Sequence, residues 1–169
     1  MGKVLIVVDM QNDFVTGSLG SAAAQALIPQ IQSKIKEYQS QGQDVIFTRD
    51  THYDNYMDTF EGKNLLVPHC IKGTVGWEVI PELEDPKCEH IDKETFGFSG
   101  WESFAQYDGF ELCGVCTDIC VVSNALALRM FYPNKEITVD ASCCAGTSEE
   151  AHKAALVTMK SCQIRVYGV

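Results

Sequence analysis

The sequence predicts an α/β fold: a mostly parallel six-stranded sheet with helices on both faces, in a Rossmann-like arrangement. Short runs rich in Val and Ile alternate with longer stretches of helical periodicity, a pattern that favours parallel sheets built from β-α-β units. The 169 residues contain no repeat, low-complexity stretch or linker. This length suits one hydrophobic core, and a single domain is therefore predicted over residues 1–169.

The predicted elements follow one another along the whole chain. The first strand spans 3–8, a continuous apolar run typical of a strand buried on both faces. A helix is predicted over 23–40, and Gly42 would end it. The remaining elements are a strand at 44–48, a long irregular segment at 51–87, strands at 88–91 and 110–115, a helix at 117–130, a strand at 137–139, a helix from 148 to 160 and a strand at 164–167.

Polar residues cluster directly after the predicted strands. In parallel sheets the ligand site lies beyond the carboxyl ends of the strands, so these residues are expected to converge on one edge. They are Asp9, Arg49, Asp50, His52, Asp92, Lys93, Cys116, Asp118, Cys120 and Asp140. A thiol, a lysine, a histidine and several carboxylates at one edge indicate a chemical site rather than ordinary turn residues.

Charge and hydropathy exclude several classes of partner. The formal net charge is −10, which repels phosphate backbones and anionic lipid, so neither nucleic acid nor a membrane is an expected partner. No apolar run approaches the roughly 20 residues that a transmembrane helix needs. Eight cysteines occur without a recognisable secretion signal, so they are expected to be reduced and the protein to be cytoplasmic.

Cys120 is the candidate nucleophile. It lies at the start of the helix after the fourth strand, where backbone N–H groups favour a thiolate. Lys93 would lower the thiol pKa further, Asp9 could accept the thiol proton, and backbone N–H groups of the turn at 114–120 could bind an oxyanion. The alternatives are that Cys120 is simply buried, or that Cys113 and Cys116 form a redox pair, which the location of Cys113 in a predicted strand disfavours.

Asp50, His52 and His69 are the candidate metal ligands. A D-x-H sequence just past a strand places both side chains on the same side of an extended segment. Two imidazoles and one carboxylate suit zinc, manganese or iron better than calcium or magnesium, and zinc is preferred here. Glu61 is a possible fourth ligand. The alternative is that both histidines are solvated loop residues.

Four segments together resemble a known family, the isochorismatase-like cysteine hydrolases, and within it the nicotinamidases. Residues 9–14 are similar to its opening D-x-Q-x-D-F, and 48–52 with 68–74 resemble the metal-site pair of nicotinamidases. Residues 93–96 resemble its K-x-x-[FY], and 114–121 its nucleophile turn, G-V-x-T-D-x-C-V. The resemblance covers nearly the whole chain and implies the isochorismatase-like hydrolase fold.

The resemblance also implies a role for each matching residue. It implies a catalytic triad of Asp9, Lys93 and Cys120, metal ligands Asp50, His52 and His69, a cis peptide between Val115 and Cys116, an oxyanion hole from the amides of Cys116 and Cys120, and Phe14 in the substrate pocket. Leu66 occupies the pocket position at which nicotinamidases usually carry an aromatic residue, so another side chain would have to supply that wall.

The expected activity is metal-assisted hydrolysis of a small amide, nicotinamide or an analogue, to an acid and ammonia through a thioester with Cys120. The alternatives are another hydrolase of the family that acts on an N-carbamoyl or ureido amide, and a catalytically silent binding protein of the same fold. The expected partners are the small-molecule amide and further copies of the chain in a homo-oligomer.

Overall fold

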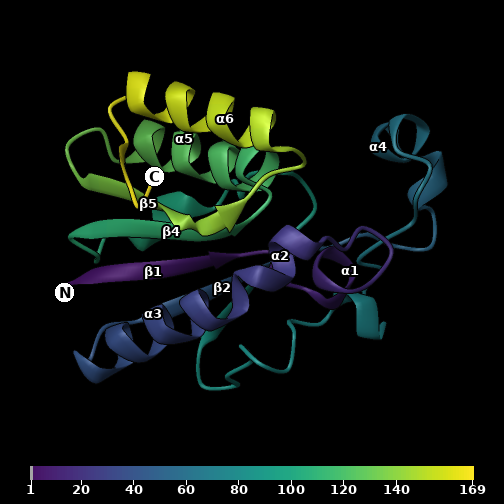
Figure 1. Ribbon diagram of the computed structural model, residues 1–169, viewed down its shortest axis with the longest axis horizontal. Helices are drawn as coiled ribbons and strands as arrows, with labels where there is room; N and C mark the ends of the chain where they lie inside the picture. The colour runs from purple at the N-terminus through teal and green to yellow at the C-terminus, as the bar shows by residue number, and fades with distance from the viewer. Residues whose placement is uncertain (1) are drawn as a thin grey trace.

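The computed structural model describes residues 2–169, which form one sheet with helices on both sides. All neighbouring strands are parallel, and their order is β3-β2-β1-β4-β5-β6. Figure 1 labels the four central strands, β2, β1, β4 and β5. The strands are β1 (Lys3–Val8), β2 (Val45–Asp50), β3 (Glu89–Lys93), β4 (Gly109–Val115), β5 (Glu136–Ala145) and β6 (Arg165–Tyr167). The predicted α/β class and the six-stranded sheet are confirmed, and the sheet is parallel throughout.

Helices cover the two faces of the sheet. α3 (Ile28–Ser40) lies on one face, whereas α5 (Val122–Phe131) and α6 (Glu149–Ser161) lie on the other (Figure 1). The single helix predicted over 23–40 is two helices, because α2 (Ala22–Ala26) ends before Leu27 and α3 begins with Pro29 in its first turn. Proline is tolerated there since the first N–H groups of a helix lack intrahelical partners. No helix within residues 2–169 is both long and apolar enough to cross a lipid bilayer.

Three strands run further than the sequence predicted. β2 ends at Asp50 and β3 at Lys93, so these residues are the last of their strands, and β5 continues to Ala145. Asp140 consequently lies inside β5, where it pairs with Tyr167 of β6 and forms a 2.8 Å ion pair with Lys34 of α3. The prediction that Asp140 lies at the ligand-binding edge is wrong, because its ion pair with the partly buried Lys34 makes this carboxylate compatible with the interior of the strand.

The long segment between β2 and β3 contains short helices. They are η1 (Tyr56–Asp58), α4 (Phe60–Asn64) and η2 (Val75–Trp77), and the first two form an arm, residues 56–66, that stands away from the sheet (Figure 1). Thr59 caps α4 by accepting a 3.0 Å hydrogen bond from the Gly62 amide. The buried Tyr56 donates a 2.9 Å hydrogen bond to the Leu65 carbonyl, which ties the two ends of the arm together.

β1 forms the centre of the hydrophobic core. Val4 to Val8 have no exposed surface, as expected for a central parallel strand covered on both faces. The helices contribute Ile31, Ile35 and Tyr38 from α3, Ala125 and Leu128 from α5, and Leu156 and Met159 from α6. Most buried polar side chains gather at the carboxyl ends of the strands, although Glu111, Thr138 and Asp140 are buried within β4 and β5.

Gly114 allows β1 and β4 to approach each other at that end of the sheet. It lies opposite Val8 and has a φ of +113°, a conformation that side-chain-bearing residues rarely adopt. A Cβ at this position would lie 2.2 Å from the carbonyl oxygen of Val8, which is backbone and cannot move aside. Glycine is therefore required where the central strand pair ends.

We expect Gly114→Ala to lower the free energy of unfolding by roughly 3 kcal/mol or more, because it combines a steric clash with a strained φ. Gly42→Ala is the matched control, since Gly42 has a φ of +67° but no atom within 4 Å of an added Cβ. That control should lose only about 1–2 kcal/mol. Urea unfolding monitored by circular dichroism measures both, and equal losses would contradict the proposed clash.

Candidate active site

Three ionisable side chains meet at the carboxyl ends of β1, β3 and β4. Asp9 follows β1, Lys93 ends β3, and Cys120 lies in η4 (Thr117–Val121), a turn of π-helix that follows β4. The Lys93 Nζ atom is 2.7 Å from Oδ2 of Asp9 and 3.5 Å from Sγ of Cys120. All three residues are buried. The structure thus brings together the three residues that the sequence singled out.

Asp9 is fixed by the neighbouring strand β2. Its backbone is left-handed, with a φ of 50°, a region that aspartate enters more readily than most residues. The Asp9 amide donates a 3.1 Å hydrogen bond to the Thr48 carbonyl, and the Thr48 hydroxyl donates a 2.6 Å bond to Oδ1 of Asp9. These bonds turn the carboxylate toward Lys93 and Cys120.

Burial and mutual charge shift the pKa values of Asp9, Lys93 and Cys120. Burial raises the pKa of Asp9, although the Lys93 ammonium opposes the shift. Burial lowers the pKa of Lys93, but the charges of Asp9, Cys120 and Asp50 outweigh it and hold that pKa above its usual range. Burial and then the Asp9 charge raise the pKa of Cys120, and Lys93 counteracts them. Burial and the Asp9 charge therefore oppose the thiolate that Lys93 was predicted to favour.

The turn that carries Cys120 is a π-helix, which is wider than the regular α-helix predicted over 117–130. The Val115–Cys116 peptide is cis, as the resemblance implied. The carbonyl of Cys116 then accepts hydrogen bonds of 3.1 Å from the amides of both Ile119 and Val121. Cys113, by contrast, has no exposed surface inside β4, and all eight cysteines are free thiols. That burial leaves Cys113 poorly placed for a redox pair with Cys116.

Asn124 ties the cysteine turn to the loop after Lys93, and sequence reasoning missed it. Its fully buried amide donates to the carbonyls of Cys120 (2.8 Å) and Phe96 (3.2 Å). Its Oδ1 atom accepts from the Phe98 amide (2.8 Å) and the Trp101 indole (3.0 Å) in η3 (Trp101–Phe104). The sequence signal was a lone amide in an otherwise apolar stretch of helix, one turn beyond Cys120.

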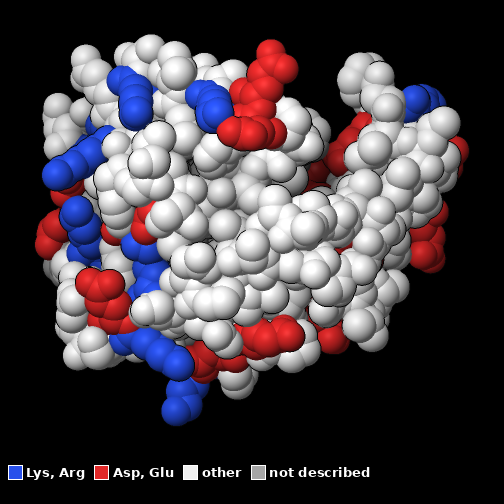
Figure 2. Space-filling view, viewed as in Figure 1, with Lys and Arg blue, Asp and Glu red and all other residues white. Residues whose placement is uncertain are grey.

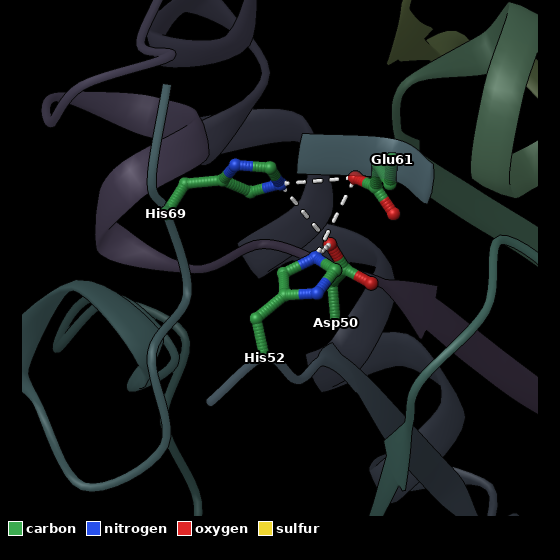
Figure 3. A group of neighbouring side chains, drawn as sticks. All are labelled: Asp50, His52, Glu61 and His69. Atoms are coloured by element: carbon green, nitrogen blue, oxygen red, sulfur yellow. Dashed lines mark hydrogen bonds and ion pairs between the residues drawn. The ribbon is translucent and has the colours of Figure 1, made fainter. Parts of the chain in front are cut away.

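A second group lies beside the first and consists of Asp50, His52, Glu61 and His69. Their side chains point toward one another (Figure 3), and their potential ligand atoms all lie within 4.8 Å of each other. The Nε2 atoms of His52 and His69 are 2.9 and 3.4 Å from Oδ2 of Asp50, and both are 3.5 Å from Oε1 of Glu61. The four residues form a candidate metal-binding group.

Residues of the D-x-Q-x-D-F segment hold this group in place. The Gln11 side chain donates to the Asp50 carbonyl and accepts from the Asp50 amide, both at 2.8 Å. Asp13, in α1 (Asn12–Val15), accepts a 2.8 Å hydrogen bond from the amide of Cys70, the residue directly after His69. His52 also pairs with the backbone around Ile71. The D-x-Q-x-D-F segment therefore holds both the end of β2 and the loop that carries His69.

The donor atoms of this group suit a divalent transition metal. Nδ1 of His69 lies 2.7 Å from the Val67 carbonyl and donates its proton there, while Nε2 lies 3.4 Å from Oδ2 of Asp50 and 3.5 Å from Oε1 of Glu61. Burial raises the pKa of Asp50, but hydrogen bonds from His52 and His69 outweigh it and hold that pKa well below its usual range. Within residues 2–169, Oδ1 of Asp50 has no hydrogen-bond partner, an unusual state for a buried carboxylate oxygen.

Both groups open into one cavity of about 1020 Å³ between the body and the arm. Asp50, His52, Glu61, His69, Cys116 and Cys120 all line it, and Phe14 does so with its ring centroid 5.4 Å from that of His69. The expectation that Leu66 lines the pocket is wrong. Its side chain is 69% exposed, and Leu65 and Phe60 form that part of the wall because the arm turns Leu66 outward.

Not every polar residue near the strand ends belongs to the site. Arg49 pairs with Asp92 at 2.7 Å and stacks on Trp77, on the opposite side of β2 from Asp50 in the alternation of the strand. Asp118 accepts hydrogen bonds from the amide and hydroxyl of Thr147, at 2.8 and 2.6 Å. The prediction that all these residues converge is therefore wrong for Arg49, Asp92 and Asp118, whose side chains have structural partners.

Comparisons with known proteins match this architecture. Residues 3–168 match the family profile described as the Isochorismatase domain. A nicotinamidase/pyrazinamidase of Mycobacterium tuberculosis is 28% identical over 194 aligned positions, covering 97% of each chain. The crystal structure of the pyrazinamidase of Pyrococcus horikoshii in complex with zinc has a TM-score of 0.88 and 27% identity, and the match covers 99% of each chain. A protein of Arabidopsis thaliana named as a probable inactive nicotinamidase is 26% identical, covering 95% of this chain and 89% of its own.

The family match spans nearly the entire chain and includes both groups of buried side chains. It also agrees with the parallel sheet and with the motifs that carry Asp9, Lys93 and Cys120. The chain therefore belongs to the isochorismatase family of hydrolases.

Proposed function

We propose that this protein is a metal-assisted cysteine amidohydrolase that converts nicotinamide, or a close analogue, to the corresponding acid and ammonia. One observation carries the proposal: the Cys120 thiol, 3.5 Å from Lys93, borders the same cavity as the Asp50, His52, Glu61 and His69 group. A thiol alone would suit many reactions. Its position beside a candidate metal group favours an amide whose ring can be anchored while the carbonyl faces sulfur.

In the proposed reaction, Asp9 accepts the proton of the Cys120 thiol as sulfur attacks the amide carbon. The amides of Cys116 and Cys120 are proposed to bind the oxyanion of the tetrahedral intermediate. The C–N bond then breaks, Asp9 returns the proton to the leaving nitrogen, and ammonia departs from a thioester. Water, deprotonated by Asp9, attacks that thioester, which releases the acid and restores the thiol.

Lys93 is proposed to stabilise charge rather than to transfer protons. Its pKa lies above the usual lysine range, so its ammonium remains charged throughout the working pH range. A positive charge 3.5 Å from sulfur favours the thiolate when it forms, which burial alone would oppose. The hydrogen bond from Nζ to the Thr95 carbonyl, 3.3 Å long, helps to hold the ammonium between Asp9 and Cys120.

Asp50, His52 and His69 are proposed to hold zinc, with Glu61 as a fourth ligand and manganese or iron as alternative metals. Bound there, the metal supplies a Lewis-acid anchor for a ring nitrogen of the substrate. The Nε2 atom of His69, which faces both carboxylates, and the Oδ1 atom of Asp50, which accepts no hydrogen bond within residues 2–169, support this fit. The names of the relatives also support it, since one similar structure is a pyrazinamidase in complex with zinc.

We expect Cys120→Ala to abolish ammonia release from nicotinamide, because no other group supplies the nucleophile. Cys116→Ala should be far milder, since only the backbone amide of Cys116 takes part. A coupled ammonia assay measures turnover, and circular dichroism verifies that each variant is folded. Full activity in Cys120→Ala would exclude the proposed nucleophile.

We expect substitutions of Lys93 and of Asp9 to shift the pH at which alkylation of Cys120 is half-maximal, in opposite directions. Lys93 lowers the thiol pKa and Asp9 raises it, so Lys93→Met should move the alkylation midpoint to higher pH and Asp9→Asn to lower pH. Asp9→Asn should nevertheless lose about 10²–10⁴-fold in kcat, because the amide cannot move protons. Iodoacetamide labelling followed by mass spectrometry gives the midpoints. The same midpoint in wild type and Lys93→Met would refute the role of lysine.

We expect protein purified without a histidine tag to contain stoichiometric transition metal that is lost in His52→Ala. That variant should also show a raised KM for nicotinamide, because the ring nitrogen loses its anchor. His90→Ala is the matched control, since His90 stacks on Phe47 away from the cavity and should leave the metal content unchanged. Elemental analysis measures the metal. A metal-free wild type that stays fully active after chelation would disprove this site.

A further inference from the structure

The cavity is much larger than a small aromatic amide requires. Its volume of about 1020 Å³ is at the upper end of the roughly 300–1,000 Å³ typical of pockets that enclose drug-sized ligands. It extends from Cys120 to Phe60 and Leu65 on the arm and to the loop at residues 18–21. A pyridine ring with one carboxamide, placed between the two buried groups, would leave most of this space empty.

The charges of the cavity disfavour a substrate that carries a carboxylate. Its acidic lining residues are Asp50, Glu61 and Glu94, and within residues 2–169 no lysine or arginine lines it. Figure 2 shows the hollow between the arm and the body with acidic side chains within it. The nearby Lys93 is already paired with Asp9 at 2.7 Å. A divalent cation would offset two of the three negative charges and leave Glu94 to repel an anionic ligand.

The outer walls of the cavity are apolar and unusually exposed. Phe60 is 86% exposed, Phe96 45% and Leu65 38%, and all three line the same cavity. Leu19 and Ala24 face it from the body. Large apolar side chains that converge on a ligand cavity are typical of a surface that a ligand covers. Because this surface continues from the site of chemistry, the covering group is best supplied by the substrate itself.

We propose that the preferred substrate is an uncharged carboxamide whose aromatic ring carries an apolar substituent, with the substituent lying between Phe60, Leu65 and the loop at 18–21. This inference rests on the proposed amide hydrolysis at Cys120. It excludes substrates with a second, anionic group, such as N-carbamoyl amino acids. The carboxamide determines reactivity, and the apolar walls determine which carboxamide is chosen.

The test compares nicotinamides with hydrogen, methyl, propyl or phenyl at the ring carbon meta to both the nitrogen and the carboxamide. We expect kcat/KM to rise along the alkyl series by roughly fourfold per buried methylene. A carboxylate at the same carbon should lower kcat/KM at least tenfold relative to its methyl ester. A flat or falling alkyl series, or a preference for the carboxylate, would overturn the proposal.

Two variants test which side chains cause these substrate preferences. Phe60→Ser should reduce the propyl-to-hydrogen ratio of kcat/KM toward one, and Glu94→Gln should reduce the discrimination against the carboxylate. Val157→Ser is the matched control, because Val157 is 64% exposed on α6 and does not line the cavity. An unchanged ratio in Phe60→Ser would overturn the proposal. So would a change of oligomeric state in that variant, measured by sedimentation, since a second copy would then cover these side chains.

A binding measurement can test the preference for an apolar substituent independently of the proposed reaction. In Cys120→Ala, calorimetry with the same nicotinamides should give dissociation constants that fall as the alkyl group grows. If the wild type releases no ammonia from any of these amides but the binding trend holds, the proposed function fails and the preference for an apolar substituent stands. If turnover occurs but binding is indifferent to the substituent, the proposed function stands and this inference fails.

Discussion

The buried ion pair between Asp9 and Lys93 is the interaction on which this end of the molecule depends. It joins the ends of β1 and β3 across β2 with a separation of 2.7 Å, and neither side chain is more than 1% exposed. Removing two charges from water is costly, and removing one partner would leave the other uncompensated. The pair persists because Thr48 bonds the carboxylate while the Thr95 carbonyl and Cys120 surround the ammonium. Stability and reactivity therefore share the same two residues.

The central strands could be predicted because their burial on both faces is visible in their own short stretches of sequence. A strand buried on both faces is apolar at every position, so β1 was predicted with its observed ends, and β4 within one residue. β5 was predicted too short because Asp140 and Ser142 interrupt its apolar run. Its pairing with β4 and β6 and the ion pair of Asp140 with Lys34 are long-range contacts that a local pattern does not reveal. The arm shows the same limit: a one-residue difference decides whether Leu65 or Leu66 faces the cavity, and a helix of five residues has no periodicity to fix it.

The site residues fall into two classes of predictability. Reactive side chains such as Cys120 and His52 could be found from their types and their places after strands. Residues that hold the backbone in place could not be found in this way, because their hydrogen-bond partners are distant in sequence. Gln11 bonds Asp50 across 39 positions, and Asp13 bonds Cys70 across 57. Asn124 likewise bonds Phe96 and Phe98, in a loop whose course no pattern revealed. A homo-oligomer and a cytoplasmic location stay predictions.

The four candidate metal ligands come from two parts of the molecule, the body and the arm (Figure 1). Asp50, His52 and His69 belong to the sheet edge and the loop bonded to it, whereas Glu61 comes from α4 on the arm. An ion held by all four would act as a clasp between body and arm, so the amide protons of residues 56–66 would exchange more slowly with solvent when it is bound. Bound metal would then tie the arm, and with it the mouth of the cavity, to the strand ends that carry the candidate active site.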